Sequence, residues 1–113
     1  MKKKYPIADA STLLKRRVSE WAIRLRLNPR IVRVQRMTRK WGSCSTTGII
    51  TLAVDLCEQD ERFQDFVIVH ELLHLRVQNH GRLFKALMTT YVPGWRELEV
   101  SRKGAQYSRL EAA

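Results

Sequence analysis

Cysteine is scarce in this sequence, and long apolar runs are missing from it. The two cysteines, Cys44 and Cys57, are not spaced as a CxxC pair, which argues against a disulfide framework. No apolar run approaches the ~18 residues that a membrane-spanning helix needs. The basic start of the chain is not followed by the apolar segment of a signal peptide. We therefore expect a cytoplasmic protein with two reduced thiols and no association with membranes.

Acidic side chains are nearly missing from the first part of the chain. Residues 1–40 hold 13 of the 21 lysines and arginines and only two acids, whereas residues 41–113 are close to neutral. A surface of one sign attracts phosphates and other anions. Two interpretations stay open: a solubilising surface, or weak non-specific binding of nucleic acid by the basic N-terminal half. The side chains that would carry such binding are Arg16, Arg17, Arg24, Arg33, Arg36, Arg39 and Lys40.

The length and the apolar periodicity predict one domain that begins with a helix. A chain of 113 residues with 44% hydrophobic residues fits a single domain over residues 1–113, with residues 1–10 and 104–113 flexible. Helical spacing over residues 11–27 predicts an amphipathic helix, capped by Asp9 or Ser11 and ended before Asn28-Pro29. Its apolar face consists of Leu14, Val18, Trp21 and Leu25.

The rest of the chain predicts strands and then helices. Residues 31–37 and 49–56 are rich in β-branched side chains and predict an antiparallel pair of strands. Helical patterns follow over residues 60–77 and 80–91, and a final amphipathic stretch covers residues 94–103. In the helix over residues 80–91 we expect Asn79 as the N-cap and Leu83, Phe84 and Leu87 facing inward. This order predicts an α+β fold with helices packed on a small sheet.

The histidines of the chain cluster in one motif. His70-Glu71-Leu72-Leu73-His74 lies in the most apolar helical segment, and His80 follows six residues later. Residues four apart share a helix face, so His70 and His74 can bind one metal ion. Glu71 lies one step around the helix, where it can reach a metal-bound water without ligating the metal. The chain contains three histidines, all in this segment, so His80 is the expected third ligand.

Three imidazoles favour a catalytic site over a structural one. They leave the fourth position of a tetrahedral zinc ion open to water, whereas a closed site would need a fourth protein ligand such as Cys44 or Cys57. We expect one Zn²⁺ per chain, which activates a water whose proton Glu71 accepts. The expected reaction is hydrolysis of a peptide bond without a covalent intermediate.

The spacing of the histidines differs in one respect from a related motif. In HExxHxxGxxH the glycine adopts a positive φ, but this chain has Val77 at that position, and valine resists that conformation. We therefore expect the helix to end near Gln78-Asn79 and His80 to begin the next helix.

The motifs together resemble a known family, the YgjP-like metallopeptidases of the zincin group. The resemblance covers residues 12–100. Its elements are Arg39-Lys40-Trp41-Gly42-Ser43-Cys44-Ser45, Gly48-Ile49-Ile50-Thr51-Leu52, Val69-His70-Glu71-Leu72-Leu73-His74, Asn79-His80 and Phe84. Where the family has an asparagine after the Ile-x-Leu motif, this chain has Ala53.

The resemblance implies a minimal zincin-like α+β domain with a metal-dependent hydrolase site that acts on protein or peptide substrates. Its ligand spacing is similar to that of WLM-type proteases, which cleave proteins crosslinked to DNA, and this gives the basic N-terminal half a purpose. The loop around Trp41 is expected either to border the substrate cleft or to pack in the core, with Cys44 as a small buried side chain. Tyr91, Arg82 and Arg96 are candidate donors to an oxyanion.

Two other functions stay open at this point. A metal-dependent nucleotide phosphohydrolase would use the basic segment for phosphates, although no Gly-rich phosphate loop is present. A non-catalytic, zinc-stabilised nucleic-acid-binding domain would have no use for Glu71. The residues favour a zinc-dependent metallopeptidase, with nucleic-acid-associated proteins among its candidate substrates.

Overall fold

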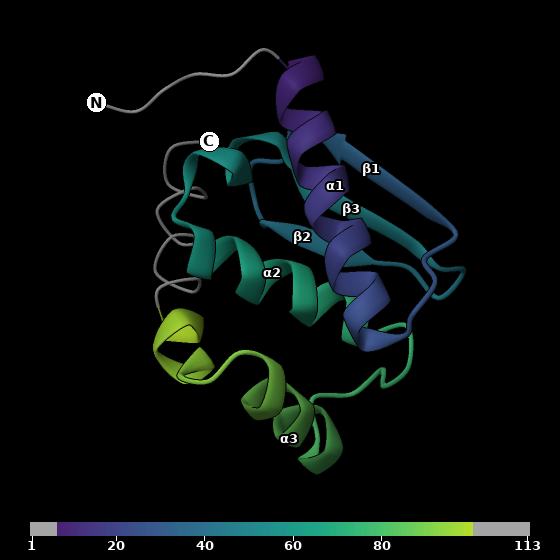
Figure 1. Cartoon of the computed structure of the whole chain (residues 1–113), viewed down its shortest axis with the longest axis vertical. Coiled ribbons are helices and arrows are strands. Elements are labelled where there is room, and N and C mark those ends of the chain that lie inside the picture. The colour runs from purple at the N-terminus through teal and green to yellow at the C-terminus, as the bar shows by residue number, and fades with distance from the viewer. Residues whose placement is uncertain (1–6, 101–113) are drawn as a thin grey trace.

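The predicted α+β class is confirmed in a computed structural model, which describes residues 7–100. Helices cover one face of a small sheet (Figure 1). The elements are α1 (Ile7–Leu25), β1 (Ile31–Gln35), β2 (Gly42–Cys44), β3 (Ile49–Ala53), the 3-10 helix η1 (Val54–Glu58), α2 (Glu61–Leu73) and α3 (Arg82–Tyr91). Residues 95–100 are helical as well. Within residues 7–100, no helix is both long enough and apolar enough to cross a membrane.

The sheet has the strand order β1-β3-β2. β1 pairs with β3 in parallel, and β2 pairs with β3 antiparallel. The prediction that residues 31–37 and 49–56 form an antiparallel pair was therefore wrong. The connection between them contains β2, and the turn at Gly48, whose φ is 89°, folds β2 back onto β3. The antiparallel neighbour of β3 is thus a strand of three residues, too short to show an alternating pattern.

α1 packs across β1 through the predicted apolar face. Leu14, Val18, Trp21 and Leu25 are all buried, as the spacing predicted. The helix begins at Ile7, so residues 7–10, which we expected to be flexible, are helical, and Asp9 lies in the first turn instead of capping it. The helix ends at Leu25 because Arg26 takes a positive φ of 56°. The predicted flexibility of residues 104–113 lies outside the described residues.

α2 forms the centre of the domain. Asp60 caps its start, since the Asp60 carboxylate accepts a hydrogen bond of 3.0 Å from the Phe63 amide. From Phe63 to Leu73 nearly every side chain is buried, because α1 and the sheet pack on one side of α2 and α3 packs on another. The motif predicted to bind metal therefore lies on the most enclosed helix of the fold (Figure 1).

α3 differs from its prediction at both its start and its buried face. Gly81 is the N-cap, whereas the side chain of Asn79 accepts a hydrogen bond from the Gly81 amide at 2.9 Å. Phe84 and Met88 are buried, but Leu83 is 57% exposed, so the expectation that Leu83 faces inward was wrong. Leu87 is half-buried against the core, so the face of α3 that packs on α2 runs through Phe84 and Met88.

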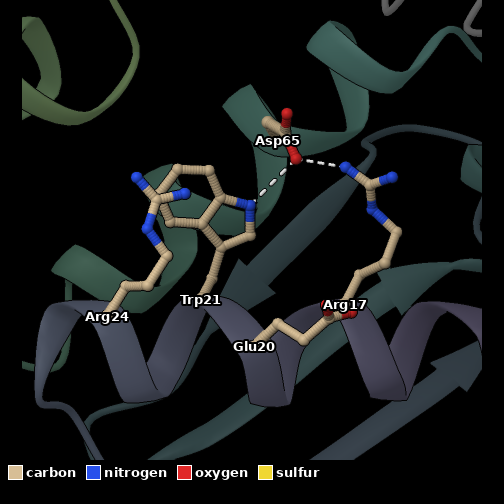
Figure 2. Close-up of a pocket in the computed structure, with 5 residues that line it drawn as sticks. All are labelled: Arg17, Glu20, Trp21, Arg24 and Asp65. Carbon is tan, nitrogen blue, oxygen red and sulfur yellow. Dashed lines mark hydrogen bonds and ion pairs between the residues drawn. The ribbon is translucent and has the colours of Figure 1, made fainter.

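A polar cluster joins α1 to α2 on the side away from the sheet (Figure 2). Asp65 of α2 forms an ion pair with Arg17 and accepts a hydrogen bond of 2.9 Å from the indole N–H of Trp21. The guanidinium of Arg24 stacks over the Trp21 ring at 4.1 Å. Arg17 and Arg24, two of the side chains expected to bind nucleic acid, thus have structural contacts within the domain.

Replacing Asp65 with alanine should lower the free energy of unfolding by about 1–3 kcal/mol, because Arg17 and Trp21 both lose their acceptor in a part-buried position. Urea unfolding followed by circular dichroism measures the change. Glu20→Ala is the matched control, since Glu20 borders the same pocket and is exposed; its effect should stay below ~0.5 kcal/mol. Equal stability of the two variants would contradict the role of Asp65.

Candidate metal centre

The three histidines lie together at the end of α2. One ring nitrogen from each of His70, His74 and His80 lies within 4.8 Å of the others. The ring centroids are 4.9 Å apart for His70 and His74, 5.0 Å for His70 and His80, and 4.7 Å for His74 and His80. His70 is on α2, His74 is the C-cap of α2, and His80 lies just before α3. The structure therefore brings together all three side chains that the sequence predicted as ligands.

The backbone reaches this arrangement with a shorter helix than we expected. α2 ends at Leu73 and not near Gln78-Asn79, and His80 precedes α3 instead of beginning it. The C-cap His74 keeps a right-handed conformation, so its side chain still lies one turn from His70. The Val77 amide then donates to the Leu73 carbonyl at 2.8 Å, and Val77 keeps a negative φ. The turn to His80 is made without a left-handed residue, as the valine at this position required.

The imidazoles are oriented by their neighbours. Nδ1 of His74 lies 3.1 Å from the Val77 carbonyl oxygen, a contact in which the ring donates. That hydrogen bond makes Nε2 the acceptor nitrogen, the arrangement usual for a metal-binding histidine. The Nε2 atoms of His74 and His80 are 2.9 Å apart. Two ligands of a tetrahedral ion at ~2.1 Å would be ~3.4 Å apart, so a small outward shift of either ring would fit a zinc-sized cation.

Phe84 of α3 contacts all three histidine rings. Its ring centroid lies 5.2 Å from that of His70, 4.9 Å from that of His74 and 4.9 Å from that of His80. The ring is 2% exposed, so it forms a fixed apolar wall behind the donor nitrogens. The sequence indicated Phe84 as an inward residue of a helix and as part of the family resemblance, but its contact with the three histidines depends on how α3 packs.

Glu71 is buried beside the first histidine. The residue is 3% exposed, and Oε2 lies 3.2 Å from Nδ1 of His70. In residues 7–100 the donor group consists of the three histidines without Glu71 or a cysteine. A carboxylate that is close to the donor group but outside it has the position expected of a general base.

Neither cysteine completes the donor group. Burial raises the pKa of the Cys44 thiol, and the negative charge of Glu71 raises it further. Cys44 lines the pocket beside His74 and His80 but is outside the donor group that the three described histidines form. Cys57 is buried in η1 and its pKa is also raised, first by burial. Among the described residues the donor group is therefore three imidazoles without a thiol.

An open pocket of about 300 Å³ adjoins His74 and His80. Its other lining residues are Cys44, Ser45, Thr46 and Gln78. Trp41 is buried and packs edge-on against Phe63 at 5.4 Å, so it belongs to the core and is not a wall of this pocket. Ala53, the departure from the family pattern, is fully buried at the end of β3.

The candidate oxyanion donors lie elsewhere or at the surface. Tyr91 lines a different pocket with Trp21 and Arg24, and the guanidinium of Arg96 stacks on Trp95 at 4.6 Å. Arg82 is exposed at the start of α3. None of the three is among the residues that line the pocket beside His74 and His80.

Comparison with known proteins identifies the family. The sequence matches the model of the YgjP-like metallopeptidase domain over residues 3–101. The chain belongs to the YgjP-like family. The YgjP-like fold is also similar to two solved structures. No curated protein matches the sequence.

Both of these structures are of metallopeptidase zymogens. Jannalysin of Methanocaldococcus jannaschii has 28% identity and a TM-score of 0.65, over 87% of this chain and 94% of that one. Abylysin of Pyrococcus abyssi has 21% identity and a TM-score of 0.67, over 78% of this chain and 90% of that one. The resemblance predicted from the motifs is confirmed, and the YgjP-like domain is a metallopeptidase domain. The family implies a divalent metal and protein or peptide substrates. It does not favour the phosphohydrolase or the non-catalytic alternative.

Replacing His80 with alanine should weaken zinc binding by more than the ~10–100-fold that loss of an outer-shell partner costs, because a directly bound nitrogen is removed. Competition with a chromophoric chelator measures the affinity, and elemental analysis gives the metal content per chain. Gln78→Ala is the matched control, since Gln78 lines the same pocket but does not belong to the donor group. Tight binding by His80→Ala would remove His80 from the ligand set.

Proposed function

We propose that this YgjP-like domain is a zinc-dependent peptidase in which His70, His74 and His80 hold one ion and Glu71 is the general base. The observation that supports this most strongly is the convergence of three imidazoles beside a buried carboxylate that is outside their donor group. Imidazole suits zinc, and three nitrogen ligands are the usual protein share of a catalytic zinc site.

The chemistry divides between the ion and Glu71. When bound, zinc would supply a Lewis acid that polarises the scissile carbonyl and acidifies the attacking water. Glu71 would take the proton of that water at its carboxylate and return it to the nitrogen of the leaving peptide. His70 holds the carboxylate close, since its Nδ1 lies 3.2 Å from Oε2 of Glu71. The peptide C–N bond breaks, and the products are a carboxylate and an amine.

The position of β2 suggests how a substrate binds. Within the described sheet β2 pairs with β3 along one side, and the chain continues from Cys44 into Ser45 and Thr46 at the pocket beside His74. An extended peptide can add to the outer edge of such a strand through backbone hydrogen bonds. We propose that the substrate is an extended peptide or an unfolded protein segment, with one uncharged side chain in the pocket.

Replacing Glu71 with glutamine should lower the rate of peptide hydrolysis by about 10²–10⁴-fold, because the amide cannot accept the proton. The zinc content should not change. Mass spectrometry of a peptide library, digested by the zinc-loaded protein, gives both the rate and the cleavage sites. Glu61→Gln, an exposed carboxylate in the first turn of the same helix, is the matched control. Equal activity of Glu71→Gln and the parent would exclude Glu71, and loss of zinc would make it a support of the ligands.

We further propose that the substrates include proteins bound to nucleic acid, because the sheet region has a basic surface. Between Glu20 and Asp55 the chain has no acidic residue. It has seven basic residues there, all exposed: Arg24, Arg26, Arg30, Arg33, Arg36, Arg39 and Lys40. Most of them lie on the strands or in their connections, away from the Asp65 cluster that neutralises Arg17.

This surface predicts weak DNA binding that falls steeply with salt. The logarithm of the association constant should fall linearly with the logarithm of the salt concentration. The slope should be about −0.7 to −0.9 per phosphate neutralised, because condensed counterions are released. Fluorescence anisotropy of labelled single- and double-stranded DNA at two salt concentrations measures it. Arg36→Glu with Arg39→Glu should weaken binding and reduce the slope, whereas the same charge change at Arg82 and Lys85 on α3 should do so less. Absence of binding at ~50 mM salt and micromolar protein would leave a solubilising surface.

A further inference from the structure

Gly42 of β2 lies against the side chain of Glu71. A methyl group on its α-carbon would lie 3.0 Å from Cγ of Glu71, 3.2 Å from Cδ2 of Leu52 and 3.2 Å from Cγ1 of Val67. Carbon atoms pack at about 3.5–4.0 Å, so each of these distances is too short. The φ of Gly42 is not positive, so the backbone conformation itself would accept another residue. Position 42 therefore requires glycine because a side chain has no space there, and not because of the backbone conformation.

The pairing of β2 explains why Gly42 faces the helix. Gly42 pairs with Leu52, Ser43 with Thr51 and Cys44 with Ile50. Since side chains alternate along a strand, residues 42 and 44 face α2 together with the buried Leu52 and Ile50. Ser43 faces the opposite side of the sheet. The strand therefore presents bare backbone to α2 at the level of Glu71.

The contacts of Glu71 enclose it from several directions. Its Cγ faces Gly42, and its Oε2 lies 3.2 Å from Nδ1 of His70. Its charge also raises the pKa of the Cys44 thiol, which follows Gly42 on the same face of β2. With 3% exposure, the side chain has little space for another orientation. Glu71 is thus close to residues of both β2 and α2.

We propose that Gly42 is a positioning residue for Glu71: its missing side chain lets β2 close on α2 and holds the carboxylate toward the three histidines. The proposal rests on the proposed function of Glu71 as general base. A methyl group at position 42 would displace Glu71 in preference to its other two neighbours. Leu52 and Val67 are fully buried in a close-packed core, whereas the Glu71 contact is the shortest and its side chain has several rotatable bonds.

The test compares Gly42→Ala with Ser43→Ala, the adjacent residue on the other face of the same strand. In Gly42→Ala, kcat for the peptide found with the parent protein should fall by about 10–100-fold, since misplacement by about 1 Å has effects of this size. KM should change by less than about twofold, because the substrate contacts remain. The zinc content should stay at the parent value. Ser43→Ala keeps the backbone of β2, through which a peptide would bind, so its kcat, KM and zinc content should equal those of the parent.

A second measurement follows Glu71 without any reaction. Glutamate labelled with ¹³C at the carboxyl carbon gives one NMR signal per side chain, and the signal absent from Glu71→Gln belongs to Glu71. This signal should shift in Gly42→Ala and stay in place in Ser43→Ala. A role of Gly42 in strand packing alone would lower the stability but leave the Glu71 signal and kcat of the folded, zinc-loaded protein unchanged.

Double variants separate the remaining outcomes. Val67→Ala removes one of the three close contacts, so Gly42→Ala with Val67→Ala should recover part of the lost kcat relative to Gly42→Ala. If Gly42→Ala does not fold, this double variant is compared with Val67→Ala. In a Glu71→Gln background, Gly42→Ala should cause no further loss, because both changes act through one side chain. A full additional loss would overturn the proposal.

The failure of this proposal differs from the failure of the proposed function. Full activity and an unmoved Glu71 signal in Gly42→Ala, with an inactive Glu71→Gln, would overturn the role of Gly42 alone. Full activity of Glu71→Gln would overturn the general base, and with it the basis of this proposal.

Discussion

The structure depends on the burial of one helix that is both the core of the domain and the carrier of its chemistry. Phe66, Val67 and Ile68 of α2 are at most 1% exposed, and the polar His70 and Glu71 two and three residues on are only 6% and 3% exposed. A buried polar group is costly unless it has a partner. The two side chains contact each other, which reduces that cost and holds them in one arrangement. The apolar core thereby fixes the orientation of the groups proposed to act in catalysis.

The motif could be predicted because it is local. Helical spacing alone places His70 and His74 on one face, and the apolar face of α1 follows from the same rule. Both predictions depend on residues three or four apart, where the geometry of the helix leaves little freedom. The clustering of the histidines in the sequence added His80 without any knowledge of the turn. The sequence did not predict where α2 ends, because the tight turn after His74 depends on how Val77 packs in the folded domain.

Features that depend on distant contacts could not be predicted. β2 has three residues, and its place beside β3 follows from pairing with Leu52 and Ile50 rather than from its own composition. The support of the histidines by Phe84 needs the packing of α3 on α2. Gly42 was part of a family motif in the sequence, but the close approach of Glu71, Leu52 and Val67 to its α-carbon follows only from the packing of β2 on α2. In each case the constraint comes from a residue far away in the chain.

Phe84 has a consequence for how a bound ion would act on the chain. The histidines at the end of α2 and the one before α3 rest on the same ring, and the backbone between His74 and His80 is the covalent connection of the two helices. An ion held by both histidines would close this connection into a short ring. Closing a short loop removes conformational freedom from its residues, and binding that needs the folded loop stabilises the fold. Metal binding and the docking of α3 on α2 would then be thermodynamically coupled. The metal-free chain would have more conformational freedom between His74 and His80 than the metal-bound chain.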